Sequence, residues 1–251
     1  MSVYLKEFNT HQEYEQYING SDVILPNVSV CTTEGDVHYN PYVDPYAGHD
    51  YVEIGGLKWA TMNVGATGIT DAGLYFQWGD ISGYTASQCG SGEGQKYFGW
   101  ADYKYGNGTS SPGATGMTKY NSTDGKTVLD AEDDAARANW GGKWRMPTLA
   151  EYAALIAAVS TAWTADYQGS GVAGMICTDN TASSKVLFFP ACGICLDGSV
   201  LSVDSYGLYW SGSLNSGEVK RAYRLYFYNT LVAWNGHYDR NLGQPVRGVV
   251  G

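Results

Sequence analysis

Charged residues are scarce in this chain, and basic residues are scarcer still. Only 16% of the 251 residues are charged, against about 25% in an average domain. Lysine and arginine together number 15 and aspartate and glutamate 25, which gives a formal net charge of −10. A protein that binds the phosphates of nucleic acid needs a basic face. The composition therefore excludes nucleic acid as a partner.

Long apolar runs are also missing. No stretch approaches the roughly 18 consecutive apolar residues that a transmembrane helix needs. The start of the chain, Met1 to Phe8, lacks the basic segment and apolar run of a secretory signal peptide. We therefore predict neither membrane insertion nor a signal peptide.

Residues that carry nucleophilic, redox or metal chemistry are few and scattered. The four histidines form no recognisable set with serine, cysteine or aspartate, and five cysteines at irregular spacing do not resemble a secreted disulfide framework. Cys192 and Cys195 form a C-x-x-C pattern, but they follow an apolar strand-like run instead of opening a helix, where a thiol pKa would be lowered. No second pair exists to complete a zinc site. We predict two unreactive thiols and no catalytic residue.

Acidic residues gather just before a predicted helix. Asp130, Glu132, Asp133 and Asp134 lack the alternating ligands and the glycine of a calcium loop. We interpret them as a solvated helix start, where negative charge suits the helix dipole. Arg145 is interpreted as a hydrogen-bonding clamp for irregular backbone, because its guanidinium carries five fixed donors. We predict no metal site and no cofactor.

Glycine (33), tyrosine (21) and tryptophan (8) take the place of charge, and the mean hydropathy is −0.26. Burial of indole rings dominates the energetics of a loop-rich domain, so we predict that the tryptophans are core residues and not ligand platforms. These are Trp59, Trp78, Trp140, Trp144 and Trp210.

Residues 1–48 are predicted to form an N-terminal arm or attachment module. A capping box at Thr10 predicts a short helix that ends after Tyr17, and the valine-rich segments 23–31 and 37–39 predict strands. Because the arm is too small for a core of its own, we expect it to pack on the body or to mediate self-association or attachment to a virion.

Residues 49–251 are predicted to form one body of the α+β class. Its strands are expected to be short and mostly antiparallel, beginning with a hairpin over residues 51–60. Long irregular loops are expected over residues 80–128. Two central helices are predicted, over residues 130–139 and 148–159.

Three segments, taken in order, resemble one protein family. They are Val52 to Asn63 with Tyr75 to Asp80; Trp140 to Thr148 with Glu151 and Leu155; and Tyr206 to Ser213 with Ala222, Leu225, Phe227, Arg240, Gly243 and Arg247. They are similar to the C-type-lectin-fold domains of the Fibrobacter major paralogous type, found in gut Bacteroidetes and their phages. That fold is shared with formylglycine-generating enzymes and with the variable proteins of diversity-generating retroelements. The resemblance covers roughly residues 50–250 and implies a C-type lectin-like fold.

Two functions within this resemblance are disfavoured by the residues. Formylglycine-generating enzymes use cysteine pairs, and no cysteine follows Cys195 in this chain. Calcium-dependent lectins carry Glu-Pro-Asn or Gln-Pro-Asp with a downstream Trp-Asn-Asp, whereas the segments at Gln244 and Trp234 here read Gln-Pro-Val and Trp-Asn-Gly. A fixed-sequence glycan-binding lectin or adhesin stays open as an alternative, and a formylglycine-generating-like enzyme as a second one.

The favoured hypothesis is a ligand-binding surface in the variable segment, residues 206–241. Tyrosine, serine, glycine and asparagine dominate this segment, as they do in antibody paratopes. Strand alternation places Leu225 and Phe227 in the core and their even-numbered neighbours outside, and residues 234–241 are expected to form an adjacent loop. Arg240 is excluded as framework, because the family keeps an arginine there. The predicted ligand-binding residues are Asn215, Ser216, Arg224, Tyr226, Tyr228, Asn229, Trp234, Asn235, His237, Tyr238, Asp239 and Asn241.

The resemblance implies that this segment is diversified by adenine-directed mutagenesis. We therefore predict a non-enzymatic phage receptor-binding or surface-adhesion protein, whose ligand is a protein or glycan on a bacterial or host surface. The predicted location is the phage virion, after synthesis in the bacterial cytoplasm, with the cell surface as the alternative.

Overall fold

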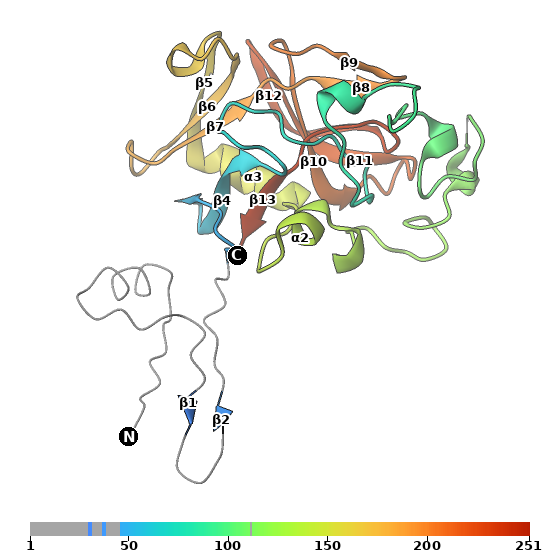
Figure 1. The fold of residues 1–251 in the computed structure, drawn as a ribbon. Helices are drawn as coiled ribbons and strands as arrows, with labels where there is room; N and C mark the ends of the chain where they lie inside the picture. The colour runs from blue at the N-terminus through green and yellow to red at the C-terminus, as the bar shows by residue number, and fades with distance from the viewer. Residues whose placement is uncertain (1–29, 32–36, 39–45, 111) are drawn as a thin grey trace. The chain divides into compact units, whose positions relative to one another are not determined.

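The structure is a computed structural model that describes residues 30–31, 37–38, 46–110 and 112–251 (Figure 1). Contacts divide the chain into two units, Met1–Gly48 and His49–Gly251. In the first unit, β1 (Val30–Cys31) pairs antiparallel with β2 (Val37–His38), within two of the segments from which strands are predicted. The predicted helix near Thr10 lies outside the described residues.

The second unit, the body, combines few short helices with many short antiparallel strands, so the predicted α+β class is confirmed. The strands form three three-stranded sheets and one two-stranded sheet, in the orders β13-β4-β3, β5-β6-β7, β10-β11-β12 and β8-β9. Their bounds are β3 (Tyr51–Ile54), β4 (Leu57–Asn63), β5 (Val159–Thr164), β6 (Gly174–Asp179), β7 (Val186–Pro190), β8 (Ile194–Leu196), β9 (Ser199–Leu201), β10 (Gly207–Leu214), β11 (Arg221–Tyr228), β12 (Leu231–Asp239) and β13 (Arg247–Val250).

The first hairpin lies where the sequence predicts it. β3 pairs with β4 across Gly55 and Gly56, which both have positive φ, as a tight two-residue hairpin turn requires. The last strand, β13, pairs with the other edge of β4. The C-terminal end of the body is thereby joined to its first hairpin, which holds the two ends of the body together.

Both predicted helices are present, with changed bounds. α3 (Leu149–Ala158) begins with the predicted capping box, in which the Glu151 amide donates to the Thr148 hydroxyl and the Thr148 amide donates to the Glu151 carboxylate. It contacts β10, β11, β12 and β5 (Figure 1). The predicted helix 130–139 is divided instead into a 3-10 turn, η4 (Ala131–Asp133), and α2 (Ala135–Trp140).

Arg145 acts as the clamp that the sequence predicts, although it is only half-buried. Its Nη1 donates to Glu151 at 2.7 Å and to the carbonyl of Met146 at 3.2 Å. The clamp therefore ties the entry to α3 to the first turn of that helix.

The core of the body consists of two clusters of apolar and aromatic side chains. One contains Trp59, Tyr209 and Phe227, and the other contains Trp78 and Trp210. Trp59, Trp78, Trp144 and Trp210 are all completely buried and Trp140 is half-buried, so the prediction of core tryptophans is confirmed for four of the five.

Residues 80–110 and 112–128 contain no α-helix and no strand longer than an isolated bridge, as predicted. Their regular structure is limited to the 3-10 turns η1 (Ala86–Gln88), η2 (Trp100–Asp102) and η3 (Ala114–Gly116). A further 3-10 turn, η5 (Tyr167–Gly169), lies between β5 and β6. The backbone of the irregular segment is therefore held by turns, isolated bridges and side-chain hydrogen bonds and not by a sheet.

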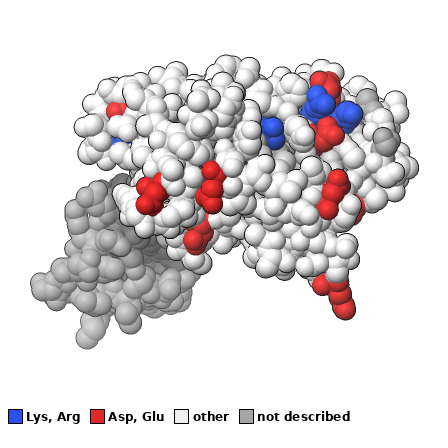
Figure 2. Space-filling view, turned by 90° about the horizontal axis from the view of Figure 1, so that it is seen from above, with Lys and Arg blue, Asp and Glu red and all other residues white. Residues whose placement is uncertain are grey.

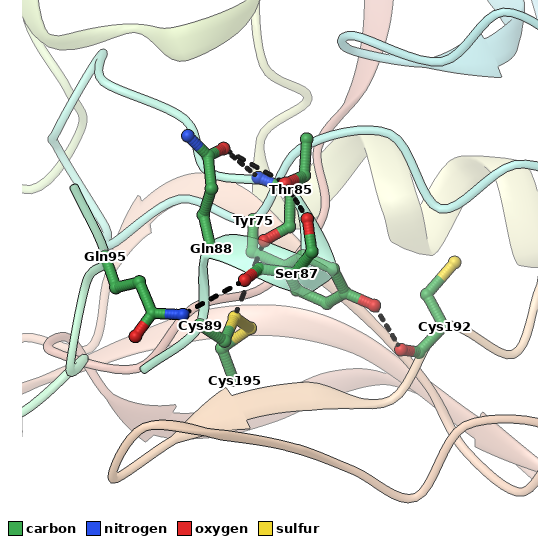
Figure 3. Close-up of a disulfide and its surroundings, with 8 residues drawn as sticks. All are labelled: Tyr75, Thr85, Ser87, Gln88, Cys89, Gln95, Cys192 and Cys195. Atoms are coloured by element: carbon green, nitrogen blue, oxygen red, sulfur yellow. Dashed lines mark hydrogen bonds between the residues drawn. A yellow bond between two sulfur atoms is a disulfide. The ribbon is translucent and has the colours of Figure 1, made fainter. Parts of the chain in front are cut away.

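A disulfide joins this irregular segment to β8. Cys89 and Cys195 are bonded across a sequence separation of 106 residues, so the prediction of two unreactive thiols is wrong for Cys195. The strand context of Cys195 is as expected, but its partner comes from a distant loop. Cys192 is a buried free thiol whose sulfur points away from the disulfide, while its carbonyl accepts a hydrogen bond from the Tyr75 hydroxyl at 2.6 Å (Figure 3).

Candidate ligand-binding surface

The two faces of β11 divide as the sequence predicts. Leu225 and Phe227 are completely buried in the first core cluster, and Tyr226 and Tyr228 on the opposite face are half-buried. Arg224 shares the face of these tyrosines but is only 9% exposed, so its prediction as an outward residue is wrong. The physical reason is that β10 pairs with β11 and carries side chains of the second core cluster on that same face.

Four tyrosine rings gather on this second face. Tyr206, which precedes β10, stacks on Tyr226 with ring centroids 5.8 Å apart and an interplanar angle of 9°. The ring centroid of Tyr228 lies 5.5 Å from that of Tyr206 and 5.7 Å from that of Tyr226. Tyr238 of β12 completes the group across Arg224. We call Tyr206, Tyr226, Tyr228 and Tyr238 the tyrosine cluster.

Arg224 lies between two rings of the tyrosine cluster. Its guanidinium carbon is 4.5 Å from the ring centroid of Tyr238 and 5.3 Å from that of Tyr226. Burial lowers the pKa of Arg224 to about 10, and the two tyrosines act in the opposite direction. The side chain is therefore a cation at neutral pH, held by ring faces.

Two other predicted ligand residues lie on the opposite face of the sheet. His237 pairs with Tyr223 and Asp239 with Arg221 across β11 and β12. Asp239 accepts a hydrogen bond from Arg221 Nε at 3.1 Å. The predicted surface is therefore divided between two faces, because the side chains of β12 alternate where it pairs with residues 221–224. The prediction of a loop over residues 234–241 is wrong for the part that forms β12.

The remaining predicted residues differ in exposure. Ser216, Asn229, Trp234 and Asn235 are exposed. Asn215 and Asn241 are buried and serve the backbone: the Asn215 side chain accepts a hydrogen bond from the Gly217 amide, and Asn241 Nδ2 donates to the carbonyl of Phe98. Tyr206, which is 36% exposed, belongs to the tyrosine cluster but is absent from the predicted set, because no strand alternation applies to a residue outside a strand.

Two hollows border this region. One has a volume of about 570 Å³ and lies between the segment Tyr97 to Asp102, the β8–β9 turn and Tyr238. The other has a volume of about 430 Å³ and lies between β5 and the β11–β12 turn, where Trp163 and Tyr228 line it. Each hollow therefore has one member of the tyrosine cluster in its wall. No local pattern in the sequence marks residues 97–102 as part of a pocket.

The free thiols Cys177 and Cys192 lie in the core and not at a surface site. Burial raises the pKa of Cys192 to about 11 and that of Cys177 to about 12. A thiol with so high a pKa stays protonated at neutral pH and is a poor nucleophile and metal ligand.

The interpretation of the acidic residues as a solvated helix start is wrong for Asp133. It is buried and binds the Lys104 ammonium at 2.9 Å and the Lys119 ammonium at 2.5 Å. It also accepts hydrogen bonds from the hydroxyls of Tyr105 and Tyr120. Although burial favours its neutral form, the bonds from Lys119, Tyr105, Tyr120 and Lys104 hold the pKa of Asp133 well below its usual range.

The same group of carboxylates is close enough to share a metal ion. Asp130, Glu132 and Asp133 bring their oxygens within 4.8 Å of one another. The Lys119 ammonium is already within 3.3 Å of all three side chains. The lysine thus supplies the positive charge at this place, and the sequence does not show it because Lys119 comes from the irregular segment.

Replacement of Asp133 by asparagine is expected to lower the free energy of unfolding at pH 7 by about 2–3 kcal/mol, because it removes the buried charged acceptor of two lysine ammoniums and two tyrosine hydroxyls. The low folded-state pKa of Asp133 means that its contribution is present above the unfolded pKa of about 4 and is lost as the pH falls further. The difference between Asp133→Asn and the wild type should therefore shrink below about pH 4. Urea unfolding at several pH values measures this. Glu132→Gln is the matched control, since the Glu132 side chain is 72% exposed, and an equal loss in both variants would contradict the expectation.

The visible surface of the body is largely uncharged. In Figure 2 the acidic and basic residues of this face form small separate groups on a surface that is otherwise of other residue types. Among the described residues, no helix is long and apolar enough to cross a membrane; α3, with ten residues, has about half the necessary length. Comparison with family models, with curated proteins and with solved structures finds no match to this chain.

Proposed function

We propose that this chain is a non-enzymatic binding protein that contacts a protein ligand through the tyrosine cluster. The observation that carries this proposal is the gathering of four tyrosine rings on one face of a sheet whose other face is core. Tyrosine offers a large amphipathic contact area at low cost in rotamer entropy. A rigid sheet behind such a surface keeps the rings preorganised, which reduces the entropy lost on binding.

Exposed aromatic residues on β12 support the same proposal. Tyr238 is 42% exposed and Trp234 is 37% exposed, both on β12 at the edge of the sheet. Contiguous apolar surface with polar tips is typical of interaction sites, and aromatic residues are enriched among those that dominate binding energy. The neighbouring hollows would admit side chains of the ligand on either side of the cluster.

The finer proposal is that the body has a C-type lectin-like fold and that its segment 206–241 is diversified by a retroelement of a Bacteroidetes phage. The protein would then be displayed on the virion and would bind a receptor on a bacterial or host surface. Sequencing of the locus tests this: a reverse-transcriptase gene and a near-copy of the coding segment for residues 206–250, differing only where the copy has adenine, would support it. Substitutions spread evenly over the whole gene would contradict it.

The binding role is tested with the double variant Tyr226→Ser/Tyr228→Ser. We expect it to lose at least about tenfold in affinity for a protein target found among bacterial surface proteins, since truncation of a central aromatic commonly costs more than 1.4 kcal/mol. Tyr51→Ser is the control, because Tyr51 is 40% exposed on β3 in a different sheet. Surface plasmon resonance with the immobilised target gives both affinities. Equal binding by both variants would contradict the proposal, and targets found only on a glycan array would favour the lectin alternative instead.

A further inference from the structure

Arg224 is the buried arginine whose hydrogen-bond donors have no acceptor. It is 9% exposed, and its Nε is completely buried without a hydrogen-bond partner. Among the described residues, none accepts a hydrogen bond from its guanidinium or forms an ion pair with it. Its guanidinium lies against the ring faces of Tyr226 and Tyr238.

The other buried arginines of this chain differ from Arg224 in this respect. Arg240 donates to the Tyr103 hydroxyl and to three backbone carbonyls. Arg247 donates to the Asn63 side chain and likewise to three backbone carbonyls. A buried guanidinium is normally satisfied in this way, because an unpaired buried donor costs stability. Arg224 is therefore an exception within its own chain, and the fold does not explain it.

The strand opposite Arg224 provides no acceptor for its guanidinium. Gly236 lies opposite Arg224 across β11 and β12 and adds no side chain over it. The nearest titratable side chains on β12 beside Tyr238, His237 and Asp239, lie on the other face of the sheet by the strand pairing, and Asp239 is bonded to Arg221. No carboxylate of the described residues neutralises Arg224, although the chain as a whole has a net charge of −10.

We propose that Arg224 receives one carboxylate of the ligand between the rings of Tyr226 and Tyr238. This inference rests on the proposed function, because it assigns the chemistry of one contact within the same surface. The guanidinium fork matches the planar geometry of a carboxylate, and the pair is strongest where ring faces exclude water. An incoming carboxylate would supply the acceptor that the fold does not provide.

The narrow access to Arg224 favours a carboxylate on a flexible chain. With 9% of the residue exposed, a glutamate or aspartate side chain, or a C-terminus, can reach it without bringing a bulky group between the rings. A carboxylate attached directly to a sugar ring would have to bring that ring into the same space. The occupant is accordingly an acidic group of a protein ligand, and an acidic sugar becomes an outcome of the test.

The test is a titration of the isotope-labelled full chain, followed by the Nε–Hε resonances of its arginines. The probes are acetate, N-acetylglutamate, the neutral acetamide, glucuronate and inorganic phosphate. We expect a saturable shift of the Arg224 resonance with acetate and N-acetylglutamate and none with acetamide. The resonance is identified by its loss in Arg224→Met. Arg221, which already has carboxylate partners, serves as the internal control and should not shift.

Three results would overturn the proposal. The absence of a saturable shift at Arg224 would show that no carboxylate enters, and it would leave binding through the tyrosine cluster intact, since no protein ligand is used. Tighter binding of glucuronate than of N-acetylglutamate would assign the position to an acidic sugar. Tighter binding of phosphate than of either carboxylate would assign it to a tetrahedral anion.

A stability measurement distinguishes a ligand-binding role of Arg224 from a structural one. If Arg224 serves a ligand, the free protein gains little from it, because a buried cation without a partner is disfavoured. Arg224→Met should then have a melting temperature equal to or above that of the wild type. A loss as large as that of Arg240→Met would show that Arg224 holds the tyrosine cluster together as a structural element, and would overturn the proposal.

Discussion

Replacement of Arg240 by methionine is expected to lower the free energy of unfolding by about 3–5 kcal/mol. Arg240 is completely buried and donates to the Tyr103 hydroxyl at 2.8 Å and to the carbonyls of Tyr120 and Val219 at 3.0 and 2.8 Å. Its guanidinium carbon also lies 4.8 Å from a ring centroid of Trp78. Methionine fills similar volume but leaves these acceptors unpaired, and each unsatisfied buried group costs about 1–3 kcal/mol.

The effect should be largest in the irregular segment, because three of the four hydrogen-bond partners of Arg240 belong to it, namely Tyr103, Lys119 and Tyr120. Urea unfolding followed by tryptophan fluorescence gives the total loss, and amide hydrogen exchange shows whether residues around Tyr103 and Tyr120 open first. Arg221→Met is the matched control: the Arg221 side chain is 34% exposed in its ion pairs with Glu218 and Asp239, so its loss should stay below about 1 kcal/mol. Similar losses in both variants would show that Arg240 does not organise the segment.

Local patterns predict the parts of this fold that depend on local physics. The capping box at Thr148 sets the start of α3, and Gly55 with Gly56 sets the first hairpin. The alternation of β11 likewise separates Leu225 and Phe227 from Tyr226 and Tyr228. In each case the residues that decide the structure lie within a few positions of one another.

The burial of Arg224 could not be predicted, because it depends on β10. A period of two shows which side chains share a face, but it does not show what covers that face. Trp210 pairs with Arg224 in register and belongs to the second core cluster. Both faces of the sheet are therefore covered near β10, and exposure on the second face increases toward the edge strand.

The prediction of a loop over residues 234–241 is wrong for a different reason. β12 is one of the two edge strands of its sheet, and its side chains are half-buried or exposed with none fully buried. An edge strand of this kind needs no apolar periodicity, so residues 234–239 have the composition of a loop. The pairing with β11 fixes the strand instead, and it divides His237 and Asp239 from Tyr238.

The partners of Asp133 and Cys195 could not be predicted either, because they lie far away in the sequence. The partners of Asp133 include Lys104 and Tyr105, which lie 29 and 28 residues earlier in the chain. The acidic pattern alone could not show that two lysines and two tyrosines would enclose one member of it. Cysteine pairing is equally invisible to spacing when the partner comes from an irregular segment.

Removal of the disulfide in the double variant Cys89→Ser/Cys195→Ser is expected to lower the free energy of unfolding by about 4 kcal/mol, because the bond restricts the unfolded chain over a long loop. The closed loop spans a sequence separation of 106 residues. For a protein of this size each kcal/mol corresponds to roughly 2–4 °C, so the melting temperature should fall by about 8–16 °C. The disulfide also anchors the segment around Cys89 to β8, whose next turn, with Asp197, lines the larger hollow.

A reducing agent provides the matched comparison for this variant. Dithiothreitol should lower the melting temperature of the wild type to that of Cys89→Ser/Cys195→Ser and should leave the double variant unchanged. The free thiols Cys177 and Cys192 are buried, so they offer no substitute partner without unfolding of the core. Equal melting temperatures of the wild type with and without dithiothreitol, with reduction verified by thiol titration, would show that the covalent link adds nothing. The irregular segment would then be held to β8 by its noncovalent contacts alone, among them the hydrogen bond from the Gly198 amide to the carbonyl of Tyr97 at 2.7 Å.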